Sequence, residues 1–232
     1  DCPIPSHLLT GDSIDIDVYL ENKPQQSRWY PGAGLYRNVH LVESDAIHIP
    51  TFGILVRTPK VSTESASVAI EVELMNGMNE LTSEKFNELT SEGIRIQTDI
   101  LYGEEVVATT EGAKSEAVVK EPKLWSPETP HLYTARTRVY KSQESRVKSQ
   151  ELLDERETRF GFRTISYTAE KGFQLNGQTR KFKGVCLHHD LGPLGAAIHK
   201  DALRHQIAIL QEMGCDAIRT SHNMPAPELV EL

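Results

Sequence analysis

Residues Ser67 to Leu74 read SVAIEVEL, and this alternation of polar and apolar side chains is the pattern from which the class of fold follows. A period of two places every apolar side chain on one face of an extended strand. Such a strand is stable only when its apolar face packs against another layer of structure. The sequence on either side of residues 67–74 therefore decides whether a β-sandwich can form.

Further runs with strand character flank this stretch on both sides. They lie at Ile47–Val56, which Pro50 and Gly53 interrupt, and at Ile94–Leu101, Val106–Thr109, Ala117–Val119, Leu132–Tyr140 and Glu155–Phe162. About seven short strands over roughly 115 residues predict an immunoglobulin-like β-sandwich. The Cys…Trp…Cys pattern of antibody domains does not occur, so no disulfide is expected between the sheets. Residues 75–92 are polar and predict a long exposed loop.

The first 44 residues predict the last strands of a separate β domain. Ser13–Leu20 and Leu35–Val42 alternate in the same way, and each is predicted as a strand. The loop between them is rich in turn residues and holds Arg28, Trp29 and Tyr30. Its two adjacent aromatic residues have no obvious place in a core.

After about residue 165 the pattern changes to strands that alternate with helices. An Asn-Gly pair at residues 176–177 predicts a tight hairpin. A buried strand, a helix with an apolar stripe, a second buried strand and the start of a second helix then follow one another. These four elements are expected at Phe182–Leu187, Asp201–Met213, Cys215–Arg219 and Pro225–Leu232, with Gly214 placed to end the first helix. This order predicts the βαβ unit of a parallel sheet.

Composition and charge exclude several classes of partner. The chain of 232 residues has a net charge of -8, and it has no cluster of Lys and Arg. Nucleic acids and anionic membranes require a concentrated positive surface, so neither is an expected partner. No run of about 18 apolar residues occurs, so no transmembrane helix is expected. No signal peptide is visible; the compartment is periplasmic or extracellular if the parent protein carries one, and cytoplasmic otherwise.

The three cysteines are Cys2, Cys186 and Cys215. Their number is odd and their spacing is wide, so neither a disulfide framework nor a structural zinc site is expected. Cys186 and Cys215 each lie in an apolar, strand-like run. Both are therefore predicted to be buried, unreactive thiols.

A first polar cluster, made of His188, His189 and Asp190, directly follows the buried strand at residues 182–187. In parallel α/β folds the carboxyl ends of the strands form the active site. Side chains of these types can hold the hydroxyl groups of a sugar, bind a metal or move a proton. The alternative interpretation is a polar loop that has no function beyond closing the strand.

A second polar cluster runs from Arg219 to Asn223 and includes His222. It follows the next strand, so both clusters are expected at one rim. A guanidinium at this position can orient a carboxylate and keep it ionised. The alternative is a helix cap, because Ser221 or Asn223 can cap the helix that begins near Pro225.

A metal site is a weaker interpretation of the same residues. His188, His189, Asp190 and His222 are suitable ligand types. However, adjacent histidines on an extended segment point in opposite directions, which hinders joint binding of one ion.

Six segments together resemble glycoside hydrolase family 2, the family of β-galactosidases, β-glucuronidases and β-mannosidases. Each segment is short, but the six occur in the family's order and span most of the chain. The first and fifth are most similar to the bacterial β-galactosidase branch. The segments are Ser27–Val39, Leu124–Tyr133, Arg159–Arg163, Phe173–Gly177, Gly184–Asp190 and Ile218–Asn223.

The resemblance implies a mainly β chain with three parts. Residues 1–44 would be the C-terminal part of a jelly-roll sugar-binding domain, and residues 45–165 an immunoglobulin-like β-sandwich. Residues 166–232 would be the N-terminal part of a (β/α)8 barrel. These limits agree with the three parts that the hydrophobic pattern indicates.

The resemblance also implies roles for individual residues. His188 and His222 match histidines that line the sugar subsite at the bond to be cleaved, and Arg219 matches an arginine that supports the nucleophilic carboxylate. The remaining candidates for substrate binding are weaker matches around that site or in the jelly-roll loop that reaches it. They are His189, Asp190, Asn223, Arg28 and Trp29.

The family hydrolyses β-glycosides with retention, using two carboxyl groups about 5 Å apart. Residues 173–232 cover about two of the eight βα units of a barrel. Both catalytic glutamates are therefore expected beyond Leu232, and the chain alone is expected to be inactive. Glu228 and Glu231 are expected on the solvent face of a helix, without a catalytic role.

The expected partner is a β-galactoside or a related carbohydrate, and no redox cofactor is implied. Some relatives use Mg²⁺ or Na⁺, whose ligands are not recognisable in this sequence. Two alternatives remain open: a non-catalytic carbohydrate-binding or spacer sandwich, and a metal-dependent barrel hydrolase. A partial barrel leaves strand edges unpaired, so residues 166–232 are predicted to associate with another copy, as a homo-oligomer, or to be loosely held.

Overall fold

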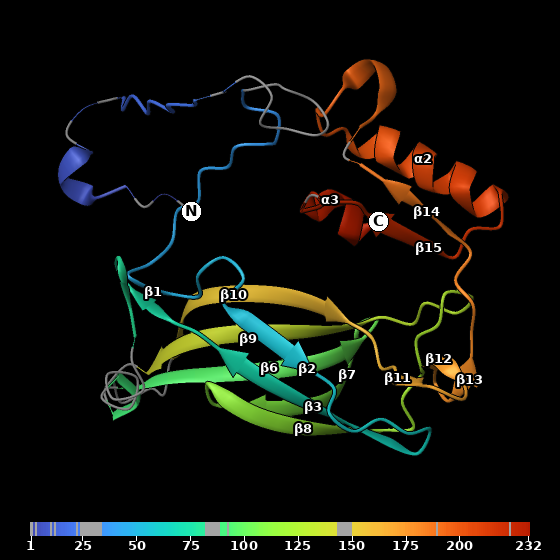
Figure 1. The fold of residues 1–232 in the computed structure, drawn as a ribbon. Helices are drawn as coiled ribbons and strands as arrows, with labels where there is room; N and C mark the ends of the chain where they lie inside the picture. Colours follow the sequence, from blue (N-terminus) through green and yellow to red (C-terminus); the bar gives the residue numbers. More distant parts are fainter. Residues whose placement is uncertain are drawn as a thin grey trace. The chain divides into compact units, whose positions relative to one another are not determined.

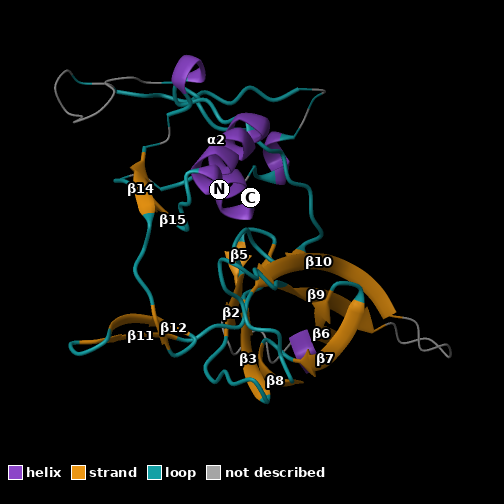
Figure 2. Cartoon of the chain, turned by 90° about the vertical axis from the view of Figure 1, so that its right-hand side faces the viewer, coloured by secondary structure: helices purple, strands orange, loops and turns teal. Residues whose placement is uncertain are grey.

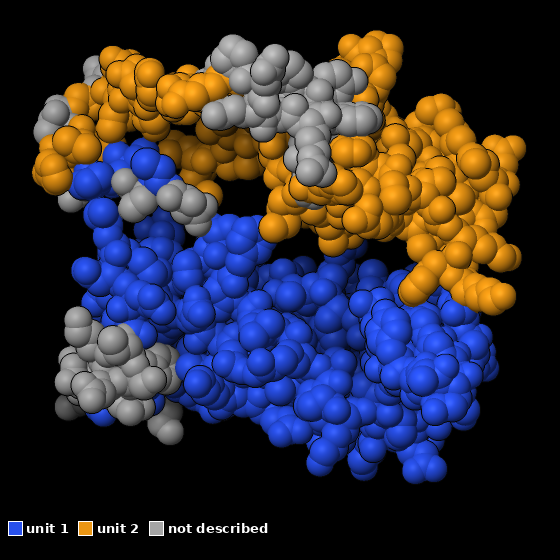
Figure 3. Space-filling model, viewed as in Figure 1, with its two compact units in different colours: residues 1–5, 43–180 blue, residues 6–42, 181–232 orange. Residues whose placement is uncertain are grey.

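The computed structural model describes residues 2, 4–9, 11, 13–21, 23, 34–81, 89–91, 93–142, 150–188, 190–222 and 224–232. The chain divides into two compact units (Figure 3). One contains residues 1–5 and 43–180, and the other residues 6–42 and 181–232. Strands form most of the regular structure (Figure 2), so the predicted mainly β fold class is confirmed. Among the described residues, no helix has the length and hydrophobicity needed to cross a bilayer.

The first unit contains a sandwich of two antiparallel sheets (Figure 1). The larger sheet has the strand order β10-β9-β6-β7 and the other has the order β2-β3-β8, with a small sheet of order β1-β4-β5 beside them. The strands are β1 (Ile47–His48), β2 (Ile54–Arg57), β3 (Ser65–Val72), β4 (Met75–Asn76), β5 (Asn79–Glu80), β6 (Ile94–Tyr102), β7 (Glu105–Glu111), β8 (Lys114–Lys120), β9 (Tyr133–Ser142) and β10 (Gln150–Phe160).

The core lies between the two sheets because each strand turns one apolar face inward. Val68 and Ile70 of β3 are fully buried, as is Ile100 of β6. A polar pair with almost no exposed surface lies in this interior: the Oγ1 atoms of Thr98 and Thr137 are 2.9 Å apart and hydrogen-bonded. Because each hydroxyl is the other's partner, this pair does not carry the full cost of burying a polar group.

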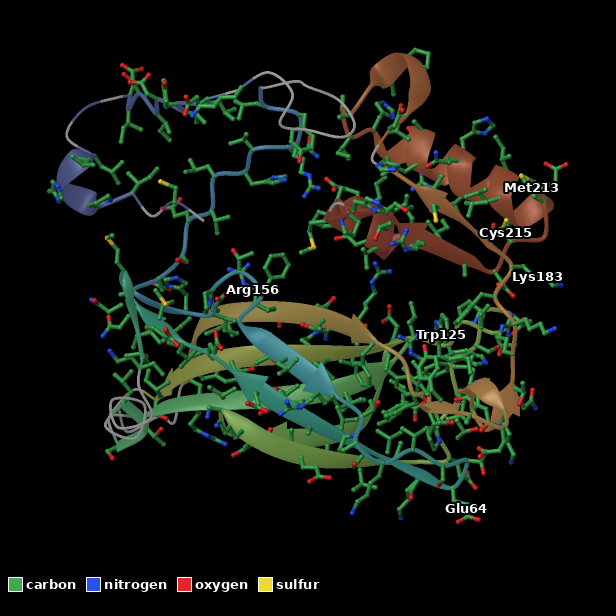
Figure 4. The ribbon with its side chains drawn as sticks, viewed as in Figure 1. Glu64, Trp125, Arg156, Lys183, Met213 and Cys215 are labelled. Carbon is green, nitrogen blue, oxygen red and sulfur yellow. The ribbon has the colours of Figure 1, made fainter. Side chains whose placement is uncertain are left out.

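An aromatic cluster closes one end of the sandwich. The Phe162 side chain has no exposed surface. Its ring centroid lies 4.7 Å from that of Tyr133 and 5.3 Å from that of Phe160, and both contacts are edge-to-face. The main chain of Phe162 also accepts a hydrogen bond from the amide of Trp125 at 2.8 Å. The cluster therefore joins the last strand of the sandwich to the loop that contains Trp125 (Figure 4).

The predicted hairpin at residues 176–177 is present and packs on that loop. Asn176 and Gly177 have φ values of +50° and +76°, as the tight turn requires. The Asn176 side chain makes two hydrogen bonds to the main chain. Its Nδ2 atom donates to the carbonyl oxygen of Trp125 at 3.0 Å, and its Oδ1 atom accepts from the Thr164 amide. The first unit consequently extends through the three strands of this small sheet, which are β11 (Ile165–Thr168), β12 (Gly172–Leu175) and β13 (Gln178–Thr179).

A bidentate ion pair between Arg180 and Glu128 joins the same hairpin to the loop. Hydrogen bonds from Arg180 lower the pKa of the Glu128 carboxyl to about 2. Replacing Arg180 by alanine is expected to return this pKa towards its ordinary value of 4.5, measured by carboxyl NMR during a pH titration. The pair's contribution to stability is present above about pH 4.5 and is lost as the pH falls towards 2.

That contribution is expected to be small, because the Glu128 side chain is 63% exposed. Arg136→Ala is the matched control, since Arg136 pairs with Glu157. It should leave the Glu128 titration unchanged. A Glu128 pKa that stays near 2 in Arg180→Ala would contradict the assignment of the shift to this pair.

Two parts of the chain differ from the prediction. Residues 13–20 and 35–42 form no strand, and Tyr19 and Leu41 are exposed. Alternation favours a strand only where a neighbour supplies the hydrogen-bonding edge, and neither segment has such a neighbour among the described residues. Conversely, the predicted loop at residues 75–92 includes the hairpin of β4 and β5, whose two-residue turn begins at Gly77 with a φ of +59°.

The second unit contains the predicted βαβ unit. Strands β14 (Gly184–Leu187) and β15 (Ala217–Thr220) are parallel neighbours. Helix α2 (Lys200–Glu212) connects them, and the short helix α3 (Pro227–Glu231) follows β15. Gly214 ends α2 in the left-handed conformation, with φ of +81°, as predicted. The described residues of this unit also form two 3-10 turns, Ser6–Leu8 and Gly192–Leu194.

Candidate functional site

The site is organised by the close pairing of β14 and β15. Gly184 lies opposite Ala217, and a Cβ atom at Gly184 would stand only 2.4 Å from the Ala217 carbonyl oxygen, so this position requires glycine. Before the strands, the main-chain amide of Lys183, which is labelled in Figure 4, donates to the Asp216 carboxylate at 2.8 Å. After them, the Ser221 amide donates to the Leu187 carbonyl oxygen at 2.9 Å. The register is thus fixed at both ends, and the residues that follow the two strands emerge side by side.

The structure brings His188 and His222 together at these carboxyl ends. Their ring centroids lie 5.5 Å apart and the rings are inclined at 54°. His222 has a φ of +68°, a left-handed conformation that only a minority of non-glycine residues adopt. Such conformations persist where the surroundings hold them, and they are common at binding sites.

His188 is held against the helices. It is half-buried and borders a shallow hollow that is open to solvent. The walls of this hollow are mostly apolar and come from the strand ends, α2 and α3; they include Leu187, Leu203, Ser221, Ala226 and Leu229. The His188 ring therefore lies at the junction of the strand end with both helices.

Arg219 lies on β15, three residues before His222. Its Nη1 atom donates to the Ser221 hydroxyl at 3.0 Å and contacts the Cys186 sulfur at 3.7 Å. Ser221 is buried and Arg219 is exposed. One guanidinium nitrogen of Arg219 is thus held by Ser221. Because Arg219 is exposed, its other nitrogens can bind an anionic group.

The prediction of buried thiols was wrong for Cys186, which is exposed, and Cys215 is only half-buried. The physical reason is that β14 has one neighbouring strand among the described residues, so its other edge is open and leaves Cys186 accessible. Hydrogen bonds from Ser221 and Arg219 lower the pKa of the Cys186 thiol, because they stabilise its thiolate form.

The structure describes only some of the other residues that the sequence predicted for the site. Asp190 caps the local turn, since its carboxylate accepts a hydrogen bond from the Gly192 amide at 3.0 Å. Ser221 does not cap α3, whose N-cap residue is Ala226 and makes no side-chain cap. Four candidates lie outside the described residues, so their placement stays a prediction. They are Arg28, Trp29, His189 and Asn223.

Sequence reasoning missed two residues that contact this region. Arg37 donates a hydrogen bond from Nη2 to the Met224 carbonyl oxygen. Asn38 donates to Glu228 Oε1 at 2.8 Å. Glu228 is therefore half-buried and has a partner, instead of facing solvent as expected. Arg37 and Asn38 belong to a segment that carried the family resemblance, but sequence alone gave no reason to place them beside α3.

The described residues contain no group of three or more His, Cys, Asp or Glu side chains that could surround a metal ion.

Two family models match the chain in order. The model of glycosyl hydrolases family 2 matches residues 48–163, and the model of that family's TIM barrel domain matches residues 167–232. Together they span the sandwich, β14, β15 and both histidines. The resemblance inferred from the six sequence segments is thereby confirmed.

Individual relatives agree. A β-galactosidase of Bacteroides ovatus is 39% identical over 230 residues, which are 94% of this chain and 25% of that protein. A protein of Formosa agariphila, provisionally named a β-glucuronidase, is 37% identical over 232 residues, 99% of this chain and 21% of that protein. The crystal structure of a β-glycosidase from Bacteroides vulgatus matches with a TM-score of 0.68 and 31% identity, covering 81% of this chain and 23% of the other.

The chain therefore spans about a quarter of the length of the relatives that it matches. Its sandwich and its first parallel strands correspond to consecutive domains of one family. The chain belongs to glycoside hydrolase family 2.

Proposed function

We propose that the full-length protein that contains this chain is a retaining glycoside hydrolase that cleaves a terminal β-galactoside. The observation that carries the proposal is the pair of imidazoles, His188 and His222, at the carboxyl ends of adjacent parallel strands, with Arg219 on the second of these strands. This is the edge at which barrel enzymes bind their substrates. Family membership supplies the reaction class.

Each of these side chains has a role that its chemistry supports. An imidazole can donate or accept a hydrogen bond, so His188 and His222 can both hold hydroxyl groups of one sugar ring. The exposed side of Arg219 can orient a carboxylate from a later strand and keep it ionised, as a nucleophile requires. The retaining reaction itself uses two carboxyl groups about 5 Å apart, one as the acid/base and one as the nucleophile.

The choice of sugar rests on relatives alone. The β-galactosidase of Bacteroides ovatus is 39% identical and the provisional β-glucuronidase of Formosa agariphila is 37% identical, so a β-glucuronide is the second candidate substrate. A glucuronide carries a carboxylate that a galactoside lacks. It also has the opposite configuration at C4. A galactoside and a glucuronide with the same aryl leaving group therefore separate the two candidates.

The test is an assay of the full-length protein with 4-nitrophenyl β-galactoside and 4-nitrophenyl β-glucuronide. Faster hydrolysis of the galactoside, with β-galactose as the first product seen by NMR, is the expected result. Release of the α-anomer first would contradict retention. Hydrolysis that a chelator abolishes would favour the metal-dependent alternative, and glycan binding without hydrolysis would favour a non-catalytic module.

A further inference from the structure

The segment that contains Arg37 and Asn38 holds the chain that follows β15. The Arg37 guanidinium bonds to the Met224 carbonyl oxygen, and the Asn38 amide bonds to Glu228 in the first turn of α3. The partners are 187 and 190 positions apart in sequence. Both bonds are therefore tertiary contacts, and they hold the chain after β15 at Met224 and at Glu228.

His222 lies between two anchored points of this connection. On one side, Ser221 is buried, its amide bonds to Leu187 and its hydroxyl accepts from Arg219. On the other side, Met224 is exposed apart from the contact that its carbonyl makes with Arg37. A left-handed backbone at His222 has to be held by its surroundings, and Arg37 supplies the hold on the Met224 side.

We propose that Arg37 is a positioning residue for sugar binding, which keeps His222 in the conformation that sets its ring beside that of His188. The proposal rests on the proposed function, because it assigns His222 to the sugar. Arg37 does not touch the substrate in this scheme. It acts through the main chain of Met224, by a charge-assisted hydrogen bond that is stronger than a neutral one.

The surroundings of Arg37 suit this role. Its side chain is half-buried and its guanidinium carbon lies 5.4 Å from the centre of the Tyr36 ring. Its Nε atom is buried without a hydrogen-bond partner among the described residues. The bond to Met224 is thus the polar contact that a replacement has to reproduce. Lysine can reproduce it, whereas methionine keeps the length and the packing but has no donor.

The test uses the full-length protein with Arg37→Ala, Arg37→Met and Arg37→Lys. Loss of the bond is expected to raise both KM for the aryl galactoside and Ki for galactose by about tenfold in the alanine and methionine variants. Arg37→Lys should recover most of the affinity. Arg95→Ala is the matched control: it breaks an exposed ion pair with Glu111 in the sandwich and should change neither constant.

A purely structural role would give a different result. It would lower the melting temperature and the fraction of active enzyme, and thus the apparent kcat, while KM and Ki of the remaining enzyme stayed unchanged. A wild-type Ki for galactose in Arg37→Met therefore overturns the positioning role and leaves the proposed function intact. Should the alanine variant fail to fold, the methionine and lysine variants carry the test.

Failure of the proposed function has its own signature, which is a wild-type protein that hydrolyses no glycoside. In that case, amide hydrogen exchange tests whether Arg37 holds the His222 main chain. Faster exchange at His222 and Met224 in Arg37→Met than in the wild type supports the hold that Arg37 exerts. Equal rates overturn it.

Discussion

Replacing His222 by alanine in the full-length protein is expected to lower kcat/KM for an aryl β-galactoside by about 100-fold, because hydrogen bonds to the sugar's hydroxyl groups strengthen as the oxocarbenium-like transition state forms. The His222 ring lies 5.5 Å from that of His188 at the ends of two adjacent strands. One sugar ring can contact both. Steady-state kinetics with 4-nitrophenyl β-galactoside measure the effect.

The matched control is His205→Ala, which removes an exposed histidine on α2 and should leave the kinetics unchanged. A double variant adds a second criterion. If both imidazoles hold the same sugar, the His188→Ala and His222→Ala effects are coupled and the double variant loses less than the product of the two factors. A His222→Ala enzyme within twofold of the wild type would remove His222 from the site.

The sequence alone predicted that the two histidines lie close together, because the pattern that places them is formed by residues near them in the chain. The alternation of strand and helix predicted that residues 182–187 and 215–219 are parallel neighbours, and the residues after parallel strands share one rim. The structure pairs Leu187 with Thr220, one residue beyond the predicted end of the second strand. Pattern therefore predicted both the fold of this part and the proximity of His188 to His222.

The sequence pattern did not predict contacts between residues that lie far apart in sequence. Nothing in residues 35–42 indicates that Arg37 contacts Met224, because a hydrogen bond to a carbonyl oxygen leaves no mark on the acceptor's side chain. The exposure of Cys186 was missed for a similar reason: an apolar run predicts burial, but burial depends on which strands cover it. The strands expected at residues 13–20 and 35–42 do not form, because alternation of polar and apolar residues does not by itself supply a neighbouring strand to pair with.

Phe162→Ala is expected to lower the free energy of unfolding of the sandwich by about 3–5 kcal/mol, the usual cost of removing a buried phenyl ring and leaving a cavity. The ring has no exposed surface and contacts Tyr133 and Phe160 edge-to-face. Losing this much is a large share of the roughly 5–15 kcal/mol that stabilise a typical domain. Urea denaturation of the 232-residue chain, followed by tryptophan fluorescence, measures the change.

Phe52→Ala is the matched control, because it removes the same ring from a side chain that is 89% exposed in the turn between β1 and β2. Its effect should stay within about 0.5 kcal/mol. Phe162 also anchors the Trp125 loop, on which Asn176 holds the hairpin. The cavity should therefore speed amide exchange at Asn176 as well as in the sandwich strands. Equal losses for the two phenylalanines would contradict a core centred on Phe162, and an unchanged hairpin would limit that core to the two sheets.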